Sequence, residues 1–267
     1  MFRAMHSAAT GMNAMQLQID NISNNLANVN TTAFKKNRMS FQDLMYQTLY
    51  EAGRHRTEDI KTPTGLQVGN GVQAVGNSKV YSMGALDQTG KELDLAIVEK
   101  AQGNVSFFTI QMADGSFTYT RAGDFSLSDD GTIVTQDGFV LDPGITIPEG
   151  TLEIQIAQQG TVLALTKEDE APEEVGQIEL ARFVNPDGLK AVGKNLFIKT
   201  AASGEPIIGS PGEDSFGTIL QGSLESSNIQ VVEEMVKMIQ AQRSYELDSK
   251  AIQTAEDMLG IANNLRR

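Results

Sequence analysis

Apolar residues recur every seven positions through the first thirty residues of the chain. Two columns of this repeat, which start at Met5 and Ala8, each continue over four heptads. Their members are Met5, Met12, Ile19 and Leu26 in one column and Ala8, Met15, Ile22 and Val29 in the other. Two apolar columns with this spacing are typical of a helix that packs against other helices. The pattern predicts an N-terminal helix with one apolar seam, in which Gly11 is a weak point.

The last forty residues carry the same kind of repeat. Between Ile229 and Leu265 there is no proline and no glycine except Gly260, which predicts a helix of roughly 55 Å at 1.5 Å per residue. Ser227 and Asn228 precede it and offer an N-cap. One column holds Val231, Met238, Tyr245, Ile252 and Leu259, and three residues later come Ala241, Ala255 and Ala262, with Asp248 as the exception. A second apolar stripe, of Ile229, Val232, Val236 and Ile239, would let this helix contact two neighbours at once.

The middle of the chain has a different pattern. From about Val68 to Gly222, β-branched residues alternate with polar ones, and glycine is frequent. Four Asp-Gly pairs lie between the alternating runs and are strong turn signals: Asp114-Gly115, Asp130-Gly131, Asp137-Gly138 and Asp187-Gly188. Residues 123–143 read as two tight hairpins, and residues 167–175 form an acidic, solvated loop. This region is predicted to be all-β, built from antiparallel meanders.

Together the patterns predict an α+β fold in which the two terminal helices form an antiparallel, coiled-coil-like pair. The expected divisions are a helical domain of residues 1–36 and 226–267, an extended stretch over 37–75, and a β-rich domain over 76–225. The extended stretch carries apolar side chains, then a polar span over 54–61, then a turn at Pro63, Thr64 and Gly65. A loop of this length without structure is uncommon. A long hairpin or tongue that packs against a neighbouring molecule is therefore expected.

Composition removes several classes of function. A net charge of −13 without a Lys/Arg cluster argues against nucleic-acid binding. The chain has no cysteine, so disulfides and thiolate chemistry are excluded. Its two histidines, His6 and His55, are isolated in the sequence, and residues 84–92 imitate a phosphate-binding loop with the wrong spacing. No enzyme, cofactor, metal site or small-molecule substrate is predicted. No apolar run is long enough for a membrane span or a cleaved signal peptide.

Two terminal motifs carry a resemblance to a known family. Residues 24–36 read NNLANVNTTAFKK, and residues 227–265 read SNIQVVEEMVKMIQAQRSYELDSKAIQTAEDMLGIANNL. Both segments, and residues 176–197 between them, are similar to the flagellar rod and hook family. The stretch from Phe41 to Val72 resembles the one that distinguishes distal-rod members from hook members. One departure from the family pattern is an apparent insertion near Val98 to Ser106.

The resemblance implies a structural subunit of the distal rod that is exported by the flagellar type III apparatus. Copies would self-assemble helically into a rigid hollow drive shaft that crosses the periplasm, transmits torque and surrounds the export channel. Its helices would form the inner layer and its β domain the outer layer. Expected partners are further copies of the chain, the proximal rod proteins, the hook or hook-junction protein, and the P- and L-ring proteins. The alternatives are a proximal rod or hook subunit or, in another class, an oligomeric glycan-binding β-domain. The absence of tryptophan and an aromatic content of 6% disfavour that last alternative.

The residues expected to carry subunit assembly lie on both terminal helices. The asparagines among them are predicted to fall off the apolar seam and to bond adjacent subunits, with a merely solvated face as the alternative. This set is Met5, Met12, Met15, Ile19, Ile22, Asn24, Asn25, Leu26, Asn28, Val231, Met238, Tyr245, Ile252 and Leu259. A second set, expected to stiffen the rod, lies in the extended stretch: Phe41, Leu44, Tyr46, Leu49, Tyr50, Pro63 and Gly65.

Overall fold

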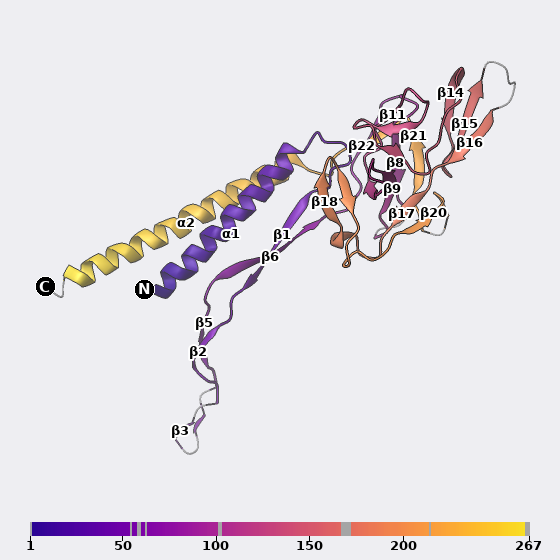
Figure 1. The fold of residues 1–267 in the computed structure, drawn as a ribbon. Coiled ribbons are helices and arrows are strands. Elements are labelled where there is room, and N and C mark those ends of the chain that lie inside the picture. The colour runs from indigo at the N-terminus through magenta and orange to yellow at the C-terminus, as the bar shows by residue number, and fades with distance from the viewer. Residues whose placement is uncertain are drawn as a thin grey trace. The chain divides into compact units, whose positions relative to one another are not determined.

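Long helices form both ends of the chain in the computed structural model, which describes residues 2–53, 55–57, 60–61, 63–100, 103–166, 172–213 and 215–264 (Figure 1). Helix α1 spans Phe2–Ala27 and helix α2 spans Val231–Asn264. The helices run antiparallel: Asn25 of α1 bonds Glu234 near the start of α2, and Gly11 lies against Asp248 further along. Their ends agree with the heptad patterns to within a few residues.

The start of α2 corrects one prediction. The backbone N–H of Glu234 donates to the carbonyl of Gln230, so the first turn forms after Asn228. The Asn228 side chain accepts from the Lys36 N–H at 2.8 Å and donates to the Val80 carbonyl at 2.7 Å. Asn228 therefore joins two chain segments of the β region and does not cap the helix.

A nested hairpin occupies the stretch between α1 and the β region. The outermost pair joins β1 (Asn37–Asp43) to β6 (Val72–Lys79). Inside it, β2 (Gln47–Tyr50) pairs with β5 (Leu66–Val68), and β3 (His55–Thr57) pairs with β4 (Ile60–Lys61). Several residues that the sequence analysis singled out lie outside the described part of the chain: Arg54, Glu58 and Asp59 of the polar span, Thr62 next to it, Ala101 and Gln102 of the apparent insertion, residues 167–171 of the acidic loop, and residues 265–267.

The chain divides into two compact units. We call the first the helix–hairpin unit; it contains Met1–Ala27, Asn37–Ser78 and Gln230–Arg267. The second, the β unit, contains Asn28–Lys36 and Lys79–Ile229. The hairpin thus groups with the two helices and not with the β strands that follow it in sequence.

A sheet of nine strands forms the main layer of the described β unit, in the order β11-β12-β13-β9-β10-β19-β18, with β17 joining β9 to β20. Because β9 pairs with β10, β13 and β17, a single meander does not describe this sheet. A second sheet, β14-β15-β16, is a run of consecutive hairpins, and two short pairs join β8 to β21 and β7 to β22. The strands are β7 Leu86–Gln88, β8 Leu95–Val98, β9 Ser106–Gln111, β10 Phe117–Thr120, β11 Phe125–Leu127, β12 Ile133–Thr135, β13 Val140–Leu141, β14 Thr151–Ile156, β15 Thr161–Thr166, β16 Glu173–Gln177, β17 Leu180–Arg182, β18 Lys190–Gly193, β19 Leu196–Ile198, β20 Ile207–Gly209, β21 Thr218–Gln221 and β22 Ser223–Glu225.

Three of the four Asp-Gly pairs form the expected tight turns. Gly115, Gly131 and Gly138 each have a positive φ and connect β9 to β10, β11 to β12, and β12 to β13. The pair Asp187-Gly188 instead belongs to a short 3-10 helix, Pro186–Gly188. The strands on either side of it, β17 and β18, pair with other partners. The turn signal at that position therefore marks a 3-10 turn and not the loop of a hairpin.

Strand β9 separates two apolar cores of the β unit. Consecutive strand residues point to opposite faces, and Phe107 and Phe108 are both fully buried. Phe108 joins a large cluster that includes Leu95, Ile133 and Ile219. Phe107 packs with a smaller, mostly aromatic cluster. Among the helices that the structure describes, none has the length and apolar content needed to cross a membrane.

Candidate functional site

Four charged side chains form a buried cluster in the β unit. The Glu225 carboxylate, at the end of β22, accepts from Lys35 Nζ at 2.5 Å and from Arg121 Nε at 3.1 Å. Arg121 also pairs with Glu99 at 2.7 Å and donates to the carbonyls of Ser106 and Ile97. The cluster therefore balances two cations with two carboxylates, as buried charges require.

The cluster joins chain segments that lie far apart in sequence. Glu225 accepts a further bond from the Gly84 N–H at 2.9 Å, and Lys35 donates to the Ser82 carbonyl at 2.9 Å. The Ala33 N–H donates to the Glu225 carbonyl at 2.7 Å, so residues 33–35 run beside the end of β22. The segment that follows α1 in the chain is thereby fixed to the segment that precedes α2.

Burial and charge act on the two ends of the Lys35–Glu225 pair in different ways. Burial lowers the pKa of Lys35, and repulsion by Arg121 lowers it further against the attraction of Glu225. Burial alone would raise the pKa of Glu225. Attraction by Arg121 and Lys35, together with the hydrogen bonds from Lys35 and Gly84, holds that pKa below its ordinary value instead. The carboxylate of Glu225 is therefore the charged centre of the cluster.

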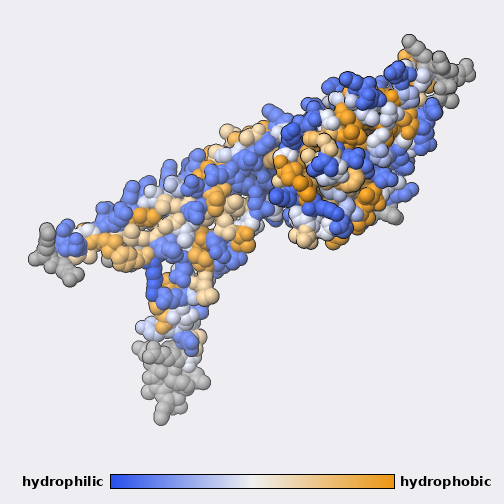
Figure 2. All heavy atoms as spheres, in the orientation of Figure 1, coloured by the Kyte–Doolittle hydropathy of each residue, from blue (hydrophilic) through white to orange (hydrophobic). Residues whose placement is uncertain are grey.

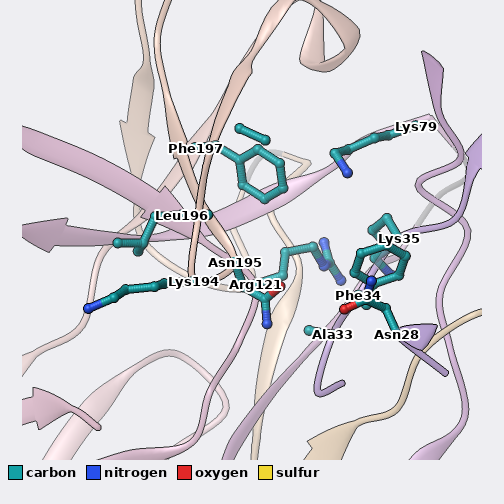
Figure 3. Close-up of a pocket in the computed structure, with 12 residues that line it drawn as sticks. Asn28, Ala33, Phe34, Lys35, Lys79, Arg121, Lys194, Asn195, Leu196 and Phe197 are labelled. Carbon is teal, nitrogen blue, oxygen red and sulfur yellow. The ribbon is translucent and has the colours of Figure 1, made fainter. Parts of the chain in front are cut away.

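A pocket of about 180 Å³ lies beside this cluster (Figure 3). The Lys79 ammonium lies 5.3 Å from the ring centre of Phe34 and 5.6 Å from that of Phe197, and burial lowers the pKa of Lys79. The lining residues are Asn28, Ala33, Phe34, Lys35, Lys79, Arg121, Ala191, Gly193, Lys194, Asn195, Leu196 and Phe197. They include cations, amides and aromatic rings but no acid–base pair of the kind that general acid–base catalysis needs. Across the described residues, no group of three or more His, Cys, Asp or Glu side chains is placed to hold a metal ion.

A second polar cluster lies in the helix–hairpin unit, between α1, α2 and the start of β1. Asn25, which is 2% exposed, donates from Nδ2 to the Asn37 carbonyl at 2.9 Å and to Glu234 Oε2 at 3.3 Å. Its Oδ1 accepts from the Asn37 N–H at 2.9 Å. Asn21 donates to the same Asn37 carbonyl at 3.1 Å, and Lys237 donates to Glu234 Oε1 at 2.7 Å.

The same unit leaves many large apolar side chains exposed. Figure 2 shows apolar surface on both the helices and the hairpin. On α2 the exposed residues are Val231, Val232, Met235, Val236, Ile239, Tyr245, Leu247, Met258 and Ile261. On the hairpin they are Met45, Tyr46, Leu49, Tyr50, Leu66 and Val75. Soluble monomers rarely expose large apolar patches without a binding role, so these faces are candidate interfaces.

Comparison with known proteins covers both units. Family models match at residues 5–35 (flagella basal body rod protein), 102–164 (flagellar hook protein FlgE/F/G D1 domain) and 220–265 (flagellar basal body rod FlgEFG protein C-terminal). The flagellar basal-body rod protein FlgG of Borreliella burgdorferi is 46% identical over 269 residues, which cover all of both chains. The FlgG of Caulobacter vibrioides is 45% identical, with 99% of each chain covered, and that of Bacillus subtilis is 36% identical over the whole of both chains. The chain belongs to the flagellar rod and hook family.

Within this family member, the predicted seam residues differ in burial. Ile22 is 1% exposed, whereas Val231 and Tyr245 are exposed in the single chain. The partly buried residues of the set are Met5, Met12, Met15, Ile19, Leu26, Met238, Ile252 and Leu259. The buried small residues of the two helices are Ala8, Ala14, Ala241 and Ala255.

The asparagines of this rod-family chain divide into different environments. Asn25 was expected off the seam, bonding adjacent subunits, but it is buried and bonded within its own chain. Asn24 is exposed, and Asn28 lines the pocket of the β unit. Among the hairpin residues expected to stiffen the rod, Phe41 and Leu44 are half-buried. The exposed ones are Tyr46, Leu49, Tyr50, Pro63 and Gly65.

Sequence patterns did not identify Arg121, Glu225 or Glu234 as site residues. Glu234 had a signal, because it stands three residues after Val231, where the heptad repeat calls for an apolar side chain. An acid at that position indicates a buried polar partner across the seam. Arg121 and Glu225 had no comparable signal. The two residues lie more than a hundred positions apart along the chain, and Glu225 ends the short strand β22.

Proposed function

We propose that this chain is a structural, non-catalytic subunit of the flagellar distal rod. Copies assemble helically into a hollow, rigid drive shaft that transmits torque and surrounds the export channel. The observation that carries the proposal is the set of apolar side chains left exposed on α2 and the hairpin. Full-length similarity to relatives named basal-body rod proteins supports it.

The helices of neighbouring copies form the inner wall. In a single chain, α2 buries one narrow side against α1 and leaves Val232, Val236 and Ile239 exposed. Burying such side chains against another copy stabilises association by about 25 cal/mol per Å² of apolar surface. Coiled-coil-like packing of each α1–α2 pair against its neighbours accounts for both apolar stripes of α2, and residues 1–36 with 226–267 act as the assembly domain.

The hairpin over residues 37–75 reaches a neighbouring copy and stiffens the rod. Its exposed tyrosines and leucines, which include Tyr46, Leu49 and Tyr50, are the contact groups. Bending a tube requires neighbouring subunits to slide past one another, and a hairpin wedged between two subunits opposes that sliding.

The β domain, residues 76–225, faces outward in this arrangement. Its partners are the P- and L-ring proteins, while the proximal rod and the hook or hook-junction protein meet the ends of the assembled shaft. Subunits arrive through the flagellar type III export apparatus, and the shaft crosses the periplasm as part of the basal body.

Electron microscopy of concentrated protein tests the proposal. Straight tubes are expected from the wild type. Val236→Asp should abolish them, because Val236 is 49% exposed in the single chain and the proposed packing buries it against another copy. Gln240→Asp is the matched control, since it adds the same charge at an exposed position of the same helix without removing an apolar group. Tubes from Val236→Asp that equal those of the control would overturn the assignment of this face to assembly.

A further inference from the structure

The first residue of the hairpin is held by α1 through side chains. In a sheet, a strand residue exchanges both of its backbone bonds with another backbone. At Asn37, the Asn25 amide takes that place: it accepts from the N–H and donates to the carbonyl, both at 2.9 Å. Asn21 adds a second donor to the same carbonyl.

Glu234 reinforces the orientation of the Asn25 amide that the backbone of Asn37 also requires. A carboxylate only accepts hydrogen bonds, so the amide must turn Nδ2 toward Glu234. That orientation leaves Oδ1 facing the Asn37 N–H, which needs an acceptor. Reversing the amide would set its oxygen against the carboxylate and its NH₂ against the Asn37 donor. The placement of α2 is thereby transmitted through α1 to the base of the hairpin.

We propose that Asn25, Asn37 and Glu234 form a latch that couples docking of the hairpin on α1 to the pairing of α2 with α1. The proposal rests on the proposed function, because it assigns these positioning residues a task in rod assembly. The helices pair first, and the latch then fixes the direction in which the hairpin leaves the helix pair. Lys237 supports the latch by holding the other oxygen of Glu234 at 2.7 Å.

A charge exchange tests the latch. Asn25→Asp keeps an acceptor for the Asn37 N–H but loses the donor to both the Asn37 carbonyl and Glu234, and it sets two carboxylates together. In the double variant Asn25→Asp with Glu234→Gln, the glutamine amide donates to the new aspartate and removes the repulsion. The control is Asn13→Asp, which makes the same change at an exposed position of α1. Hydrogen–deuterium exchange of peptides covering residues 37–43 and both helices is measured on assembled full-length protein.

Asn25→Asp should speed exchange in residues 37–43 by about tenfold, the effect of one lost buried hydrogen-bond pair. The double variant should exchange more slowly than Asn25→Asp but faster than wild type, because the repulsion is removed while the bond from residue 25 to the Asn37 carbonyl stays lost. Asn13→Asp should not differ from wild type. Equal protection of residues 37–43 in wild type and Asn25→Asp, or a double variant no better than Asn25→Asp, would overturn the latch.

A wrong rod assignment and a wrong latch give different experimental results. If the wild type forms no tubes, the rod assignment is wrong whatever the exchange pattern is. The latch then still predicts that residues 37–43 and both helices gain and lose protection together in the soluble protein. Protection of residues 37–43 alongside unprotected helices would exclude it.

Discussion

Gly11 of α1 lies directly against Asp248 of α2. A methyl group on Gly11 would lie 2.5 Å from the Asp248 carboxylate oxygen Oδ2, closer than van der Waals contact allows. Asp248 interrupts the alanine column of α2, and Gly11 is the weak point of α1 by helix propensity; the structure brings the two together. The missing side chain of Gly11 makes room for Asp248, a polar residue in the alanine column of α2.

The contact between Gly11 and Asp248 predicts that substitutions at the two positions change stability non-additively. Gly11→Ala should gain little stability in the wild type, because the helix-propensity gain of about 1 kcal/mol is offset by displacement of Asp248. In an Asp248→Ala background the same change should recover most of that gain. The melting temperature of assembled tubes, compared over the four proteins of this cycle, measures the coupling. Strict additivity would mean that the two residues do not share this space.

Truncating a side chain of the buried charge cluster should lower the stability of the β unit by a large amount. Glu225→Ala leaves Lys35 and Arg121 buried beside a missing carboxylate, so about 3–5 kcal/mol of unfolding free energy should be lost. Lys194→Met breaks the exposed Lys194–Asp137 pair and should cost less than about 1 kcal/mol. Urea unfolding of the β unit, followed by circular dichroism, gives both values. A loss at Glu225 as small as that of the control would show that the cluster contributes little to stability.

The same carboxylate predicts how stability depends on pH. The pKa of Glu225 is lower in the folded protein than in the unfolded chain. Its stabilising contribution is therefore complete above the ordinary glutamate pKa of about 4.3 and is lost as the pH falls through the lower, folded value. Glu225→Gln should flatten the fall of the urea midpoint in that acid range relative to wild type. Parallel curves for the two proteins would contradict the assigned direction.

The sequence predicts the long elements of this fold well, because their signals are local and repeated. The heptads of α1 and α2 extend over many turns, and three Asp-Gly turns follow from the φ that glycine allows. The fourth turn, at Asp187-Gly188, differs because the strands beside it pair elsewhere, which no local signal records. The Arg121–Glu225 pair and the Asn25–Glu234 bond are equally hidden, because each joins residues more than a hundred positions apart. Heptad periodicity places the apolar side chains but does not reveal which polar ones are buried between the helices.

Deleting the outer part of the hairpin tests whether the stiffness of the rod and its assembly depend on different contacts. Removing residues 47–66 deletes the outer part of the hairpin, including Leu49, Tyr50 and Leu66, all of which are exposed in the single chain. The Thr10 hydroxyl still meets Gly71, which lies opposite Leu44 at the outer end of the β1–β6 pair and where an added Cβ would lie 2.1 Å from that hydroxyl. Contact of the retained part of the hairpin with α1 is therefore preserved.

Tubes should therefore still form from this deletion, because both helices and the Asn25 cluster remain, but they should be curved or flexible. Persistence length measured from electron micrographs is the readout, and Tyr46→Ser with Leu49→Ser in the full-length chain is the milder companion variant. It removes two exposed apolar groups without shortening the hairpin and should lower the persistence length in the same direction. Straight, rigid tubes from the deletion would place the stiffness in contacts between β units instead.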